Sequence, residues 1–105
     1  MPSHYQISFY VPKTHCEVVK QAMFDAGAGK LGTYDSCAWQ TLGQGQFKPQ
    51  EGSNPFLGTT GNIEVVDEYK VEMICNKANL KAAIDALKNS HPYEEPAYSV
   101  IKLEN

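Results

Sequence analysis

The order of the patterned segments is the feature that most restricts how this chain can fold. Between residues 5 and 11, apolar side chains alternate with polar ones, which is the two-residue period of a half-buried strand. This alternation returns three times, and stretches with a helical spacing of apolar residues follow the first and third strands. Strands are expected at residues 5–11, 34–42, 63–75 and 97–103, with helices over 14–26 and around Leu80–Leu87. The order βαββαβ predicts an α+β, ferredoxin-like sandwich, in which a four-stranded antiparallel sheet carries both helices on one face.

Short-range signals indicate where the helices begin. Thr14 followed three residues later by Glu17 has the spacing of a capping box, which predicts that Thr14 is the N-cap of the first helix. Asn76 and Asn79 are both suitable N-caps for the second helix, and the sequence leaves the choice between them open.

Composition limits the classes of function. The 105 residues are enough for one domain, here residues 1–105, and the net charge is −3 with lysine at all nine basic positions. Without arginine or a basic run, nucleic acid is not expected as a partner. No apolar run reaches the roughly 20 residues of a membrane helix, so no membrane association is expected. Three cysteines without the Cys-x-x-Cys spacing favour reduced thiols and a cytoplasmic location.

A long segment rich in glycine and proline separates the second and third predicted strands. Residues 43–61 contain five of the eight glycines and two of the six prolines, and irregular loops of this length are usually functional or mobile. The segment also contains Phe47 and Phe56, which a merely flexible linker would not need. We predict that contacts of these two rings, rather than internal secondary structure, order residues 43–58. Packing and ligand binding both remain open as their role.

The densest group of polar side chains follows the second helix. His91-Pro-Tyr-Glu-Glu-Pro-Ala-Tyr98 places an imidazole, a phenol and two carboxylates close together, and these groups suit a divalent cation or acid–base chemistry. The alternative is structural: Pro92 and Pro96 would fix a rigid turn, His91 would cap the helix, and Tyr93 would pack. Both interpretations remain open at this point.

Several of these segments together resemble a known family. Residues 27–41 (GAGKLGTYDSCAWQT), 43–49 (GQGQFKP), 51–56 (EGSNPF) and 91–98 (HPYEEPAY) are similar to the inserted, YqfO-type domain of the NGG-interacting-factor-three-like proteins, which are also called GTP cyclohydrolase type 2 homologues. The His-Pro-Tyr-Glu-x-Pro element is also similar to one in the CutA divalent-cation tolerance proteins, within the wider PII-like group. The resemblance implies a ferredoxin-like fold, assembly into trimers and a contact loop after the second strand.

The resemblance does not carry an activity with it. In the full-length relatives it implies a two-metal site in the flanking domain, built from residues that this chain does not contain. We therefore expect a non-catalytic, oligomeric binding or regulatory module. The alternatives are a CutA-like protein that binds a divalent metal ion, and an enzyme with a site formed between subunits.

The candidate site residues follow from these segments. A small-molecule or protein ligand is expected at Gly43, Gly45, Phe47, Glu51, Asn54, Phe56, His91, Tyr93, Glu94 and Glu95. The metal alternative uses His91 and Glu94. Apolar residues on both parities of the second and third strands exceed what one helical layer covers, which predicts a homo-oligomer. The resemblance favours a trimer, and a two-fold dimer is the alternative.

Overall fold

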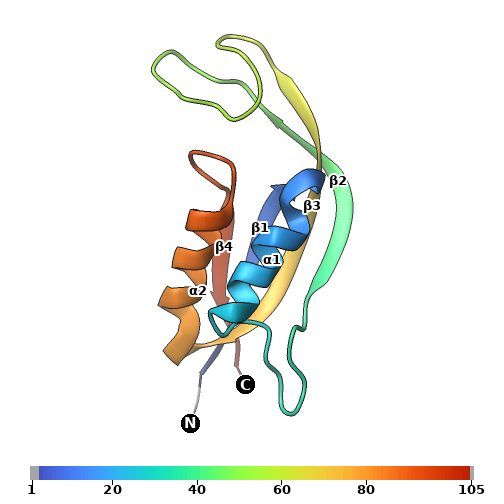
Figure 1. The fold of residues 1–105 in the computed structure, drawn as a ribbon, viewed down its shortest axis with the longest axis vertical. Helices are drawn as coiled ribbons and strands as arrows, with labels where there is room; N and C mark the ends of the chain where they lie inside the picture. Colours follow the sequence, from blue (N-terminus) through green and yellow to red (C-terminus); the bar gives the residue numbers. More distant parts are fainter. Residues whose placement is uncertain (1–2, 105) are drawn as a thin grey trace.

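The computed structural model describes residues 3–104 and confirms the predicted order of strands and helices (Figure 1). The elements are β1 (His4–Pro12), the short 3-10 helix η1 (Lys13–His15), α1 (Cys16–Asp25), β2 (Trp39–Phe47), β3 (Glu64–Asn76), α2 (Lys77–Ser90) and β4 (Tyr98–Lys102). The sheet order is β2-β3-β1-β4, and every neighbouring pair is antiparallel. Both helices lie on the same face of the sheet, as the ferredoxin-like prediction requires (Figure 1).

The core lies between the two helices and one face of the sheet. Alternate residues of β1 point into it, and Ile7, Phe9 and Val11 are completely buried. In the β1–β3 register, Ile7 pairs with Met73 and Phe9 pairs with Val71, so β3 extends the same apolar surface. The helix residues that are completely buried against this surface are Val19, Met23, Ala83 and Leu87. The alternation in the sequence therefore correctly predicted the inward sides of β1 and β3.

The opposite face of the sheet is mixed in character. Trp39 lies on this open face, because it pairs with Glu72 and not with the inward-facing Val71, and it is 62% exposed. The Gln6 side-chain amide donates to Glu72 Oε2 across the β1–β3 pair at 2.8 Å. Exposed apolar residues such as Ile101 are thus interspersed with polar ones.

The two helices begin differently from each other. Asn76 is the N-cap of α2, since its Oδ1 accepts a hydrogen bond from the Asn79 amide at 3.0 Å. The capping box predicted at Thr14 is wrong. The chain enters α1 through the η1 turn, and the Thr14 hydroxyl is 2.8 Å from His15 Nδ1. The η1 turn follows Pro12 and contains Thr14. Because α1 begins only at Cys16, Thr14 is too far from the helix to be its N-cap.

The second strand lies five residues further along the chain than its sequence pattern indicated. Residues 30–38 form turns with an isolated bridge between Leu31 and Tyr34, and β2 runs from Trp39 to Phe47. The predicted strand over 34–42 is therefore correct only for residues 39–42, and the prediction of an irregular segment from residue 43 is wrong for residues 43–47. The glycines led to this error, because glycine normally weakens a strand. Here they remain in the strand because β2 pairs with β3 along its whole length.

The β2–β3 pair forms an arm that extends beyond the helices. Its connecting segment, residues 48–63, folds back above the end of the helical layer (Figure 1). The arm accounts for the elongated dimensions of 48 × 24 × 23 Å. At the other end of the molecule, β1 begins beside the end of β4, where the Leu103 amide donates to the His4 carbonyl at 2.9 Å. Among the described residues, no helix has the length and apolar character needed to cross a membrane.

Candidate functional site

A cavity of about 480 Å³ lies where the arm, its connecting segment and the turn before β4 meet. The sheet contributes Tyr10, Thr41 and Lys70 from its open face, and β3 also contributes Glu68. The connecting segment contributes Pro49, Pro55 and Phe56, and the turn contributes Tyr93, Glu94 and Glu95. Volumes of roughly 300–1,000 Å³ are typical of small-molecule sites. Three segments that are distant in the sequence thus form one concave surface.

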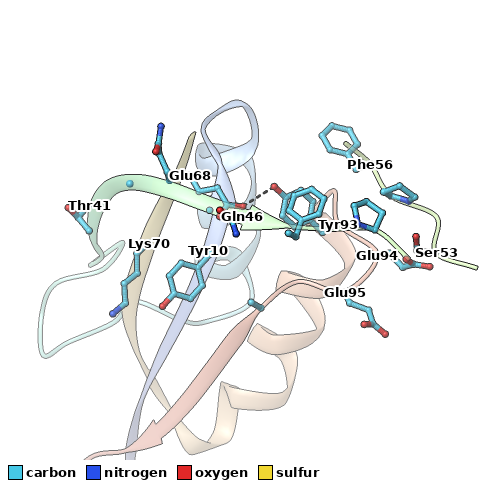
Figure 2. Close-up of a pocket in the computed structure, with 17 residues that line it drawn as sticks. Tyr10, Thr41, Gln46, Ser53, Phe56, Glu68, Lys70, Tyr93, Glu94 and Glu95 are labelled. Carbon is cyan, nitrogen blue, oxygen red and sulfur yellow. Dashed lines mark hydrogen bonds between the residues drawn. The ribbon is translucent and has the colours of Figure 1, made fainter. Parts of the chain in front are cut away.

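A buried acidic residue lies in the wall of the cavity. Glu68 is only 8% exposed, and its Oε2 accepts a hydrogen bond from the Tyr93 hydroxyl at 2.8 Å (Figure 2). Burial, together with the hydrogen bond to Glu68 and the negative charge of that residue, raises the pKa of Tyr93 well above its ordinary value. The phenol therefore stays protonated at neutral pH and acts as the donor to Glu68.

Gly45 leaves room for this position of the Glu68 carboxylate. A Cβ atom at position 45 would overlap Glu68 Oε1, so a larger residue would displace the carboxylate. Gly43 lies on the same face of β2 and has open space where its Cβ would be. Of these two strand glycines, only Gly45 leaves room for the Glu68 side chain.

Aromatic rings form much of the remaining wall. The Phe47 and Tyr93 rings meet edge-to-face with their centroids 5.7 Å apart, and Phe56 lies 6.5 Å from Tyr93. Phe56 also contacts the His15 ring at 5.3 Å, which connects the loop to η1. The prediction for residues 43–58 was thus half right: both phenylalanines make contacts, but residues 43–47 are ordered as part of β2.

His91 supports the turn from behind the cavity. Its side chain is buried, its Nε2 lies 2.7 Å from the Tyr10 carbonyl, and its Nδ1 accepts from the Tyr93 amide at 3.1 Å. These partners define the neutral tautomer with the proton on Nε2. Burial lowers the pKa of His91, and the hydrogen bond to Tyr10 opposes this effect only in part. The backbone amide of His91 also caps α2 through the Leu87 carbonyl.

The two residues of the metal alternative already have protein partners. Both ring nitrogens of His91 are engaged, and Glu94 Oε2 accepts from the Asn54 amide at 3.1 Å. A metal ion could bind His91 only by displacing one of its two backbone partners. Across residues 3–104, no group of three or more His, Cys, Asp and Glu side chains is placed to hold a metal ion.

The structure brings together most of the residues singled out from the sequence. Those lining the cavity are Gly43, Gly45, Phe47, Phe56, Tyr93, Glu94 and Glu95. His91 lies behind Tyr93, Asn54 contributes its amide to Glu94, and Glu51 lies exposed in the connecting segment. Sequence reasoning missed Tyr10, Glu68 and Lys70, whose alternate positions on β1 and β3 are the signal that they face away from the core.

The chain has a ferredoxin-like fold, and CutA proteins share that fold. CutA from Xylella fastidiosa superposes with a TM-score of 0.70 over 97% of this chain and 85% of that one, and its 20% identity supports the fold alone. No family model matches the chain.

Relatives in sequence identify the homologues of this chain more narrowly than the shared fold does. The GTP cyclohydrolase 1 type 2 homolog of Halalkalibacterium halodurans is 44% identical over 103 residues, which is 98% of this chain and 28% of that protein. A Bacillus cereus protein related to NIF3 superposes with a TM-score of 0.84 at 38% identity, over 99% of this chain and 26% of that one. The chain is therefore homologous to one segment of the NIF3-related proteins, and it spans about a quarter of their length. This result confirms the resemblance found in the sequence.

Proposed function

We propose that this chain is a non-catalytic, single-domain binding module that works as an oligomer and holds an organic small molecule in the cavity between the arm and the 91–97 turn. The observation that carries the proposal is the Glu68–Tyr93 pair, a part-buried polar contact between distant segments in a cavity whose wall also includes the rings of Tyr10, Phe47 and Phe56. A few fixed polar groups on an apolar wall are characteristic of small-molecule sites.

The protonation behaviour of the polar groups favours binding over catalysis. The raised pKa of Tyr93 moves its proton transfer away from neutral pH, whereas effective acid–base groups have pKa values near the working pH. His91 is neutral and uses both ring nitrogens for backbone contacts. These groups are therefore suited to orienting a ligand. A cytoplasmic location fits the three free cysteines.

Oligomer formation is supported by the open face and the edges of the sheet. The edge strands β2 and β4 present unpaired backbone groups, and such edges are commonly covered in an assembly. Trp39 and Leu42 are both more than half exposed on β2.

We propose a trimer, for which light scattering should give about 35 kDa from the 11.6 kDa chain, and a dimer would give about 23 kDa. A stable monomer would exclude this part of the proposal. Trp39→Glu should dissociate the assembly without unfolding the chain, because Trp39 is outside the core.

The cavity itself is tested by nuclear magnetic resonance. Small aromatic compounds of positive, neutral and negative charge are titrated into isotope-labelled protein while the glycine amides are followed. Saturable shifts are expected at Gly43 and Gly45, which line the cavity, and not at Gly32, which lies in the turn before β2. If no compound shifts Gly43 and Gly45 more than Gly32, the cavity is not a binding site.

Metal analysis of untagged protein, with and without added copper or zinc, tests the metal alternative at His91 and Glu94.

A further inference from the structure

We propose that the ligand of this cavity is a planar organic cation carrying N–H donors, of the amidinium or guanidinium type, and that Glu68 is the residue that recognises it. This inference rests on the proposed function, because it names the chemical class that the same cavity accepts.

The first support is a buried charge without a balancing partner. Glu68 is more than nine-tenths buried, and its hydrogen bond comes from the neutral hydroxyl of Tyr93. Among residues 3–104 the ion pairs are Glu17–Lys20 and Lys81–Asp85, and neither involves Glu68. Buried carboxylates are normally paired with a cation, because removing the charge from water is costly. A cationic ligand would supply the missing charge.

The second support is a carboxylate oxygen that retains a free hydrogen-bonding position. Tyr93 occupies Glu68 Oε2, whereas Oε1 lies against the backbone of Gly45 and receives no hydrogen bond from residues 3–104. No enclosed side-chain nitrogen or oxygen in residues 3–104 lacks a partner, so Oε1 must still be reachable by solvent. This oxygen can accept one N–H of a ligand. A lone pair of Oε2 remains for a second N–H, which matches the paired donors of an amidinium.

The third support is the character of the walls. The rings of Phe47 and Phe56 lie against the Tyr93 ring in the same cavity as Glu68, and aromatic faces attract cations. A flat head group can stack on such a ring while its edge donates to Glu68. A compact ammonium or a hydrated metal ion would leave most of this aromatic surface unused.

The charges around the opening also favour a cation. Glu94 and Glu95 lie on the turn side of the cavity, and Lys70 is the only basic residue in its wall as described. In Figure 2, the Lys70 side chain runs away from the Glu68–Tyr93 pair, so it does not neutralise the carboxylate. Three carboxylates against one ammonium make the cavity negative overall.

Three probes of nearly equal shape and different charge test the inference: benzamidine, benzamide and benzoate. Each is titrated into the wild-type protein while the Gly43 and Gly45 amides are followed. Benzamidine is expected to bind at least about tenfold more tightly than benzamide, because its positive charge attracts Glu68 in addition to the hydrogen bonds that both compounds can donate. Benzoate is expected to bind more weakly than either.

A pair of matched variants assigns the preference to Glu68. Glu68→Gln keeps the size of the side chain and an acceptor for Tyr93, and it should reduce the preference for benzamidine to about twofold or less. Glu72→Gln removes the same charge from the same face of β3, outside the cavity, and should leave the preference unchanged. Thermal unfolding of both variants shows whether each is folded.

The outcomes separate this inference from the proposed function. If benzamide or benzoate shifts Gly45 with an affinity equal to that of benzamidine, the cavity binds ligands but the cation inference is wrong. Equal loss of the preference in Glu72→Gln would assign it to the general field of the protein and would overturn the role of Glu68. Because the wild-type comparison does not depend on any variant, the inference stays testable even if Glu68→Gln does not fold. If no aromatic compound produces saturable shifts, the proposed function fails as well.

Discussion

Replacing Gly45 with alanine should destabilise the protein even though the change adds only one methyl group. The new Cβ would overlap Glu68 Oε1, and the whole carboxyl group would have to leave its position beside Tyr93. A hydrogen bond to a buried charged group is worth about 1.5–3 kcal/mol. Alanine recovers about 0.5–1 kcal/mol, because glycine loses more backbone freedom in a strand. The expected net loss in the free energy of unfolding is therefore about 1–2 kcal/mol.

Urea unfolding followed by far-ultraviolet circular dichroism measures this loss. Its midpoint should fall by roughly 0.5–1 M for a slope typical of a chain of this size. Gly43→Ala is the matched control, because it lies on the same face of β2 with nothing near its Cβ position. That variant should be as stable as wild type or slightly more stable.

A double-mutant cycle with Tyr93→Phe tests the cause of the loss. If Gly45→Ala acts by displacing Glu68 from Tyr93, it should cost much less when the hydroxyl is already absent, with a coupling energy of about 0.5–2 kcal/mol. Two results would refute the reasoning: equal stability of the alanine variants at 43 and 45, or simple additivity in the cycle.

Two further predictions concern the helix termini and pH. Asn76→Ala should lower stability by about 1 kcal/mol through loss of the α2 cap, whereas Thr14→Ala should have almost no effect, and thermal unfolding of both distinguishes a used cap from an unused one. Because burial lowers the pKa of His91, the unfolded chain binds the proton more readily than the folded one. The contribution of His91 is fully present above about pH 6.5 and is lost as pH falls toward its folded pKa, by at most about 1.4 kcal/mol per pH unit. Denaturant unfolding between pH 7.5 and 5 should show this slope in wild type and a reduced slope in His91→Gln.

The fold was predictable because its signals are local and repeated. The alternation in β1 places three large side chains on one side within five residues, and only one face of a strand can satisfy that pattern. Asn76 was one of two N-cap candidates in the sequence, because an N-cap depends on a side chain and the backbone three residues away, and the structure decided between it and Asn79. These features need no knowledge of distant parts of the chain.

The limits of β2 were not predictable from local signals. Gly43 and Gly45 have no intrinsic preference for a strand, and they remain extended because β3 pairs with them. The N-cap prediction at Thr14 was wrong for a related reason, because the η1 turn, which includes Thr14, decides where α1 begins.

The candidate site was only partly predictable. Tyr93, Glu94 and Glu95 were visible as a dense polar cluster, and Phe47 and Phe56 as unexpected rings in a loop. Glu68 could not be identified as a site residue, because no local sequence pattern distinguishes it from the other acidic residues of the same strand. The position of its side chain depends on the space beside Gly45, on the hydroxyl of Tyr93 and on the shape of the β2–β3 arm. These features are distant from Glu68 in the sequence, and only the folded chain brings them together.

The pairing of β1 with β4 also determines how this domain can be attached to other molecules. Chain entry at β1 and chain exit at β4 lie side by side (Figure 1), while the cavity involves the arm and the 91–97 turn at the opposite end. A host protein, a fusion partner or a solid support joined at this end would leave the cavity exposed on the side away from the attachment. Surface-immobilised measurements should therefore use either terminus as the anchor, because both leave the cavity unobstructed.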